Sequence, residues 1–140
     1  MRGASEEAST AWTRDGMGKC NWNELVTPDQ AACNAFYAQV FGWTYPDRMT
    51  MPGDMGDYTF VDAGGETIGA TMKVQAEGQA AGWHFYFRAP DIQAAAAKIS
   101  ARGGTVIQGP MEVPGGDMVL VARDPAGVTF GVAAPGKTGD

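Results

Sequence analysis

The chain contains an internal repeat with a period of 62 residues. Residues 22–70 align without a gap with residues 84–132. The matched pairs are residues that fix turns and helix starts: Pro28/Pro90, Asp29/Asp91, Gly42/Gly104, Pro52/Pro114, Gly53/Gly115, Asp62/Asp124, Gly65/Gly127, Thr67/Thr129 and Gly69/Gly131. Matches of these residue types indicate two copies of one structural module. A module of roughly fifty residues buries too little surface to be stable alone, so we expect the two copies to fold together.

Each copy is predicted to contain a strand, a helix and then three strands. In the first copy the strand is 20–26, the helix is 29–41 with Thr27 or Asp29 as its cap and Gly42 at its end, and the later strands are 43–49, 57–61 and 67–74. In the second copy the corresponding elements are a strand at 83–88, a helix from Asp91 to Gly103, and strands at 105–107, 118–122 and 128–133. The predicted fold class is therefore α+β, with two tandem βαβββ modules.

The repeat also defines the domain organisation. Residues 1–18 are polar and lie outside the repeat, so we predict a mobile N-terminal tail, in which Trp12 is either disordered or a docking residue. A single domain is predicted at 19–136, followed by a short tail at 137–140. Within the domain, module one is 19–74, the linker is 75–82 and module two is 83–134.

The composition excludes several classes of partner. A formal net charge of −6 and a pI near 4.6 argue against nucleic acid, which needs a basic surface, and against an anionic membrane. No apolar run approaches the length of a membrane span, and Met1–Thr10 lacks the apolar core of a secretory signal. The two cysteines, Cys20 and Cys33, form neither a disulfide framework nor a metal motif, which fits the cytoplasm.

Alternation along the strands predicts which side chains share a face. In strand 83–88, Trp83, Phe85 and Phe87 are expected to pack on the helix. In the last strand of module one, Ile68, Ala70 and Met72 are expected to face the helix. The opposite, helix-free side of the two sheets would then carry a mixed polar and aromatic group, as a ligand site does: Trp22, Glu24, His84, Tyr86, Arg88 and Thr71.

Two motifs resemble a known family. The pattern Pro-Asp-x-x-Ala-x-x-Ala-Phe-Tyr-x-x-Val-Phe-Gly-Trp spans 28–43, and Asp-Pro-Ala-Gly-Val-Thr-Phe-Gly spans 124–131. Together with the paired modules, they resemble the glyoxalase/bleomycin-resistance/extradiol-dioxygenase group, the vicinal oxygen chelate superfamily, over about residues 20–134. The resemblance implies a glyoxalase-like fold whose sheets curve around a shared cavity, and it implies a homodimer.

The same resemblance implies where a divalent metal would be bound in metal-dependent members. The positions are Trp22 and His84 on the first strands and Gly69 and Gly131 on the last strands. Only His84 can donate to a metal there, whereas a catalytic metal normally has three protein ligands. We therefore predict no cofactor and no metal residues. A divalent metal held by His84, Glu24 and, with a different register, Glu66 is the alternative.

Three functions follow as hypotheses. The first is a domain that binds a small organic molecule in the cavity between the modules, without a catalytic metal. The second is a lyase, isomerase or dioxygenase that uses His84 and Glu24 as catalytic residues, with or without a metal. The third is a regulatory or interaction module. Structural roles compete at single residues: His84 as a hydrogen-bonded interior histidine, Arg88 in an ion pair, and Trp43 in the core.

Overall fold

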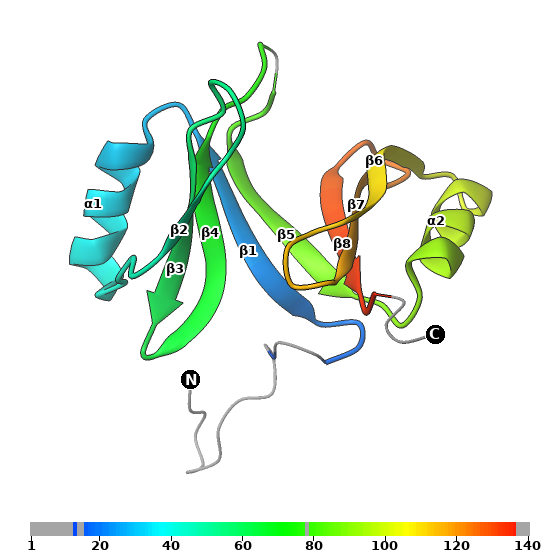
Figure 1. Cartoon of the computed structure of the whole chain (residues 1–140). Coiled ribbons are helices and arrows are strands. Elements are labelled where there is room, and N and C mark those ends of the chain that lie inside the picture. Colours follow the sequence, from blue (N-terminus) through cyan, green and yellow to red (C-terminus); the bar gives the residue numbers. More distant parts are fainter. Residues whose placement is uncertain (1–12, 14–15, 78, 137–140) are drawn as a thin grey trace. The chain divides into compact units, whose positions relative to one another are not determined.

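The computed structural model describes residues 13, 16–77 and 79–136. Its elements run in the order β1 (Cys20–Thr27), α1 (Gln30–Phe41), β2 (Arg48–Thr50), β3 (Asp57–Ala63), β4 (Glu66–Lys73), β5 (Gly82–Arg88), α2 (Ile92–Ala101), β6 (Thr105–Glu112), β7 (Met118–Arg123) and β8 (Thr129–Ala134) (Figure 1). The α+β class and the βαβββ order of both copies are confirmed. Most of the predicted N-terminal tail, with Trp12, and the tail at 137–140 lie outside the described residues.

The chain divides into two compact units. Residues 22–84 form the first unit, and the described residues on either side of them form the second. The strand order is β2-β3-β4-β1 in the first unit and β5-β8-β7-β6 in the second. In both units the strand before the helix pairs in parallel with the last strand, and the other pairs are antiparallel. A helical crossover produces this parallel pairing.

Helix α1 begins and ends as the sequence predicts. The Asp29 carboxylate accepts from the Ala32 N–H at 3.1 Å, and Gly42 ends the helix with a φ of 72°. That left-handed conformation costs glycine little, because it has no Cβ.

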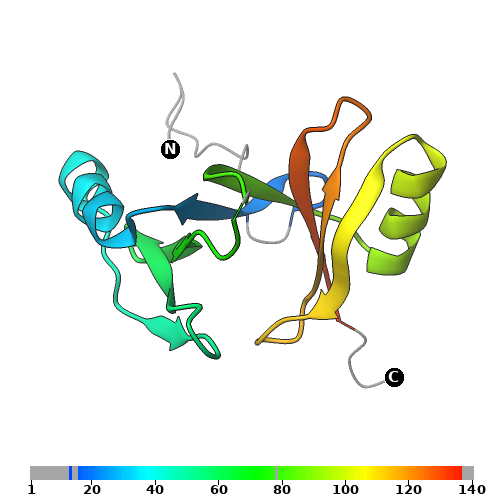
Figure 2. The same ribbon diagram turned by 90° about the horizontal axis from the view of Figure 1, so that it is seen from above.

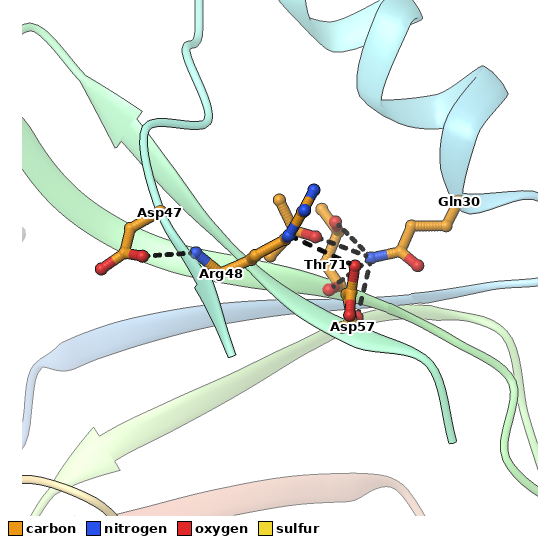
Figure 3. A network of polar contacts seen from close by, with 6 residues as sticks. Gln30, Asp47, Arg48, Asp57 and Thr71 are labelled. Atoms are coloured by element: carbon orange, nitrogen blue, oxygen red, sulfur yellow. Dashed lines mark hydrogen bonds and ion pairs between the residues drawn. The ribbon is translucent and has the colours of Figure 1, made fainter. Parts of the chain in front are cut away.

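Helix α1 makes several polar contacts with its sheet (Figure 3). The Gln30 amide nitrogen donates to the Thr71 carbonyl at 2.9 Å and to the Asp57 carbonyl at 3.0 Å. The Thr71 hydroxyl donates to the Asn34 side-chain oxygen at 2.8 Å. Residues 30 and 34 are one helical turn apart, so two amides reach the sheet from one side of α1.

The aromatic residues of α1 do not form a buried core. Phe36 is 59% exposed, and no residue of α1 is fully buried. Tyr37, Phe41, Trp43 and Trp83 instead form a ring cluster in which the Trp83 indole N–H donates to the Tyr37 hydroxyl at 3.1 Å. The prediction that Trp83 packs on the second helix is therefore wrong.

The second unit has an apolar core under α2, which lies alongside β6 (Figure 2). The core residues are Ile92, Leu120, Ala122, Val132 and Ala134, with Ala95, Ala96, Ile99 and Phe130 packed against them. Helix α2 therefore packs on its sheet through an apolar side. Phe85 and Phe87, which were also predicted to pack on the helix, are 46% and 40% exposed, so neither ring is buried in this core. Alternation fixes the side of a strand to which a residue points, but not whether the helix extends over it.

Two strand predictions differ from the structure. In place of the strand predicted at 43–49, the chain forms the short strand β2 and, before it, a single bridge from Thr44 to Asp62. Pro46 has no N–H with which to continue a ladder between them. The strand predicted at 105–107 extends to Glu112, with irregular register around Gly109. No helix among the described residues has the length and apolarity needed to cross a membrane.

Candidate functional site

The register of the first unit shows which side chains lie away from α1. Thr71 is in register with Leu25 and Thr59, and its hydroxyl binds α1. Glu24, Phe60 and Ala70 are in register with one another and lie one position along, so they belong to the opposite, helix-free face.

This register corrects the predicted faces of β4. Ala70 and Met72, expected toward the helix, lie on the helix-free face, because they pair with Glu24 and Val26. Thr71 was expected to bind ligand, and that expectation is wrong: it is fully buried and bonded to α1. Because α1 presents Gln30 and Asn34 to the sheet, the hydroxyl side of β4 packs under the helix and the apolar side does not.

Trp22 and Glu24 are brought together by a residue that the sequence reasoning missed. The Trp22 indole N–H donates to the Tyr58 hydroxyl at 2.8 Å, and that hydroxyl donates to the Glu24 carboxylate at 2.7 Å. Phe60 packs edge-on against Trp22 and Tyr58, with ring centroids 6.2 and 5.6 Å away. The helix-free face of the first unit therefore carries a hydrogen-bonded chain, Trp22–Tyr58–Glu24, among aromatic rings.

The direction of these hydrogen bonds determines what the chain can do. An indole N–H can only donate, so the Tyr58 oxygen must accept from Trp22. The single phenolic hydrogen then goes to Glu24. Two donors in sequence thus point toward one carboxylate, and each strengthens the next. The arrangement holds the Glu24 carboxylate in one position as an acceptor, and the same two bonds orient the Trp22 and Tyr58 rings.

A signal for Tyr58 and Phe60 was present in the sequence. In strand β3, Tyr58 and Phe60 alternate with Thr59 and Val61, so the two rings had to share a face. The alternation alone could not say which face, because both sets contain apolar residues. The Gln30 bond to Thr59 decides it by placing Thr59 under the helix.

Two other predicted site residues, His84 and Tyr86, make different contacts. The His84 Nε2 atom lies 3.4 Å from the Ala80 carbonyl oxygen, and the side chain is partly exposed. In the second unit, Tyr86 is in register with Gly131 and its ring covers that glycine.

Arg88 forms the ion pair that the sequence left open as a structural alternative. Its guanidinium contacts the Asp117 carboxylate at 2.7 Å, and its side chain is only 11% exposed. The backbone of Arg88 also pairs with Gly18 and Lys19. These contacts favour a structural role for Arg88 over a ligand contact.

Comparison with known proteins supports the resemblance given by the motifs. The family model of the Glyoxalase/Bleomycin resistance protein/Dioxygenase superfamily matches residues 19–132. The chain belongs to this superfamily. The "Putative glyoxylase CFP32" of Mycobacterium bovis is 36% identical over 118 residues, which is 84% of the chain and 44% of that protein. The "Anthracycline biosynthesis protein DnrV" of Streptomyces peucetius is 34% identical over 134 residues, covering 86% of the chain and 48% of that protein. The chain thus spans less than half the length of these relatives.

Solved structures show the same fold at low identity. A Streptomyces coelicolor methylmalonyl-CoA epimerase in complex with 2-nitronate-propionyl-CoA superposes with a TM-score of 0.64 and 17% identity, covering 86% of the chain and 99% of that structure. The methylmalonyl-CoA epimerase of Mycobacterium tuberculosis gives 0.63 and 10%, covering 93% of both chains. These likenesses establish a glyoxalase fold and nothing about substrate.

Superfamily members often bind a divalent metal, and the residues present here do not fit one at the expected positions. Gly69 and Gly131 stand where a carboxylate would be needed. A Cβ on Gly69 would overlap the Asn23 backbone, and one on Gly131 would overlap the Tyr86 ring. Among the described residues, no group of three or more His, Cys, Asp or Glu side chains could hold a metal ion. Closely packed neighbours therefore occupy the space in which the two ligands would project.

Proposed function

We propose that the helix-free face of the first unit binds a small organic molecule without a catalytic metal. The observation that carries this proposal is the Trp22–Tyr58–Glu24 chain, with Phe60 beside it. A carboxylate held in position by a tyrosine and a tryptophan gives an orienting polar group, and three rings give apolar contact area. All four side chains are partly exposed, so a ligand can reach them.

The names of similar proteins support a small organic molecule as the ligand. One relative is named for anthracycline biosynthesis, and one structural neighbour is a complex with a coenzyme A ester. Both names refer to small organic molecules. That the two modules share the ligand cavity, that the protein is a homodimer and that it is cytoplasmic stay predictions from the sequence.

An acid–base enzyme of the same superfamily is the second candidate. The 2.7 Å bond from Tyr58 to Glu24 favours it, since a carboxylate fixed in this way can accept a proton from a bound substrate. This candidate keeps His84 as the second catalytic residue. It predicts that His84→Ala abolishes turnover while the fold is retained, and unchanged turnover in that variant would exclude His84 from catalysis.

The binding proposal is tested with a panel of small aromatic and polar compounds and two matched tryptophan variants. Trp22→Phe removes the indole N–H that binds Tyr58, whereas Trp43→Phe alters the ring cluster on α1. Calorimetric titration should give saturable binding for at least one compound, with Kd raised about 5- to 10-fold by Trp22→Phe and unchanged by Trp43→Phe. No saturable binding, or equal effects of the two variants, would contradict the proposal.

A further inference from the structure

Helix α1 has an apolar side that is exposed. Ala32, Phe36 and Val40 follow one another at intervals of four residues, so they lie on one side of the helix, and all three are exposed. Val40 is 53% exposed, and Phe41 next to it is 60% exposed. The sequence has no aspartate, glutamate, lysine, arginine or histidine from residue 30 to residue 46. The solvent side of a helix normally carries charged and polar residues, so this apolar side of α1 requires an explanation.

The internal repeat shows that the fold alone does not account for this side. The 62-residue offset places Lys98 at the position of Phe36, and Arg102 at the position of Val40. Both Lys98 and Arg102 are exposed, and α2 exposes no large apolar side chain. Two equivalent helices, each packed on its own sheet, thus present cations to solvent in one module and apolar side chains in the other.

The exposed rings of α1 rest on further rings. The Phe36 ring lies edge-on to the Tyr37 ring, with centroids 5.1 Å apart. The Phe41 ring lies 6.0 Å from the Tyr37 ring and 5.2 Å from the Trp43 ring. Side chains that are ordered before binding lose little conformational freedom in a complex. Aromatic residues without charged neighbours are also typical of the centre of a protein–protein interface, so the apolar side of α1 has the properties of a docking surface for a protein.

The charge of the chain indicates that the partner is a second copy. Each copy has a formal net charge of −6, so two copies repel each other over most of their surface. The repulsion is smallest where neither copy carries a charge, and no charged group has to lose its water there. A strongly basic or acidic partner would find no opposite charge on this side of α1, whereas a second copy needs none.

The order of side chains along α1 is self-complementary. A two-fold axis through Phe36 pairs two antiparallel helices, so that position 32 of one copy lies opposite position 40 of the other. The small Ala32 side chain then meets the larger Val40 side chain in both halves of the contact, which allows the two helices to interdigitate. Phe36 lies near the middle of Gln30–Phe41, so this pairing uses the whole helix.

The available area is that of a weak dimer. A phenylalanine buries about 150–250 Å² when it is fully covered, so Phe36, Val40 and Phe41 offer about 300 Å² per copy at their exposed fractions. A stable interface buries about 800 Å² on each partner. A single helix pair therefore corresponds to a dimer with a Kd of about 10–100 µM, which forms and dissociates with concentration.

We infer that two copies of this chain pair antiparallel through the apolar side of α1, with Phe36 on the two-fold axis. The motifs imply a homodimer but give no surface for it, and the inference adds both the surface and the register. It does not rest on the proposed function, because α1 covers the other face of its sheet from the Trp22–Tyr58–Glu24 chain.

Two matched valine variants test the surface. Sedimentation equilibrium of the full chain from about 5 to 500 µM should show a monomer and a dimer with a Kd of about 10–100 µM. Val40→Lys should raise this Kd about 10-fold or more, because the ammonium would have to leave water against Ala32 of the other copy. Val128→Lys makes the same change at an exposed valine of the second unit and should leave the Kd unchanged.

A pair of opposite charges tests the register. Ala32→Glu alone should also weaken the dimer, whereas the double variant Ala32→Glu/Val40→Lys places each new carboxylate opposite a new ammonium of the other copy. The double variant should therefore dimerise about 10-fold more tightly than either single variant. An acidic residue in the first turn and a basic residue in the last turn both suit a helix, and circular dichroism of each variant would verify that the fold is intact.

Three outcomes would overturn the inference. A chain that is still monomeric at about 500 µM has no dimer of the expected strength. A dimer that is unaffected by Val40→Lys, or equally weakened by Val128→Lys, does not depend on the apolar side of α1. A double variant that dimerises no better than the single variants would exclude the antiparallel register.

Discussion

Gly131→Ala is predicted to destabilise the second unit through one contact. Gly131 is buried and in register with Tyr86, and a Cβ at position 131 would lie 2.6 Å from Cε2 and 2.7 Å from Cγ of that ring. Ordinary contact begins at 3.4 Å, so the overlap with Cε2 is about 0.8 Å, and Cδ2 of the same ring lies closer still. The backbone itself tolerates alanine, since Gly131 is not among the glycines with positive φ.

The magnitude follows from the cost of overpacking, about 1–3 kcal/mol for an added methyl group in a packed interior. Replacing glycine recovers about 0.4–1 kcal/mol by restricting the unfolded chain. The expected net loss is therefore about 1–2 kcal/mol, or a fall in Tm of about 3–8 °C for a chain of this length.

A double-mutant cycle measured by urea unfolding isolates the contact. In a Tyr86→Ala background, where no ring covers position 131, the same Gly131→Ala change should be neutral or slightly stabilising. If Gly131→Ala costs the same in both backgrounds, or costs nothing in the wild type, the Tyr86 ring does not lie over Gly131 and the reasoning is refuted.

Two further predictions concern α1 and its sheet. Thr71→Val should lower the free energy of unfolding by about 1–3 kcal/mol, because the Asn34 side-chain oxygen loses its donor, while ligand affinity stays unchanged. Thr71→Ser keeps the hydroxyl and serves as the control. A Thr71→Val protein that lost ligand affinity but not stability would contradict the assigned face of Thr71. Burial, and then the nearby Cys33 and Tyr37, raise the pKa of Tyr45 above its ordinary value of 10.0. The unfolded chain then releases this proton first, so the free energy of unfolding should fall as the pH rises above about 10. Urea titrations across that range should show a shallower fall in Tyr45→Phe, and equal slopes in the two proteins would argue against the shift.

Most of the fold could be predicted from the internal repeat. Pro28-Asp29 and Pro90-Asp91 begin helices, Gly42 ends one and the Asp124 turn closes a hairpin, because these residues impose local geometry whatever surrounds them. Such signals are readable without tertiary information. They gave both modules in the correct order.

The faces were harder to predict, because apolar content is a poor guide when a helix packs with amides. Gln30 and Asn34 bind the hydroxyl side of β4, which reversed the predicted orientation of that strand and removed Thr71 from the site. In module two the helix packs with alanine and isoleucine, and there the apolar side of β8 does face it. The 62-residue offset transfers turns between modules, but not packing chemistry.

The candidate site was partly predictable for the same reason. Trp22 and Glu24 share a face because they are two residues apart on one strand, and the structure joins them. Tyr58 comes from a strand 36 residues away from Trp22, and its contribution depends on the β3–β4–β1 pairing. No local pattern contains that information.

The most direct test of ligand binding on the helix-free face of the first unit is a titration followed by the tryptophan indole N–H signals in a ¹H–¹⁵N spectrum. The chain has four tryptophans, and the Trp22→Phe and Trp43→Phe variants assign two of these signals. With the tightest-binding compound of the panel, the Trp22 signal should shift and saturate at the calorimetric Kd, while the Trp43 signal stays in place. A saturating shift of Trp43 with no change at Trp22 would put the ligand on the ring cluster of α1 and contradict the account.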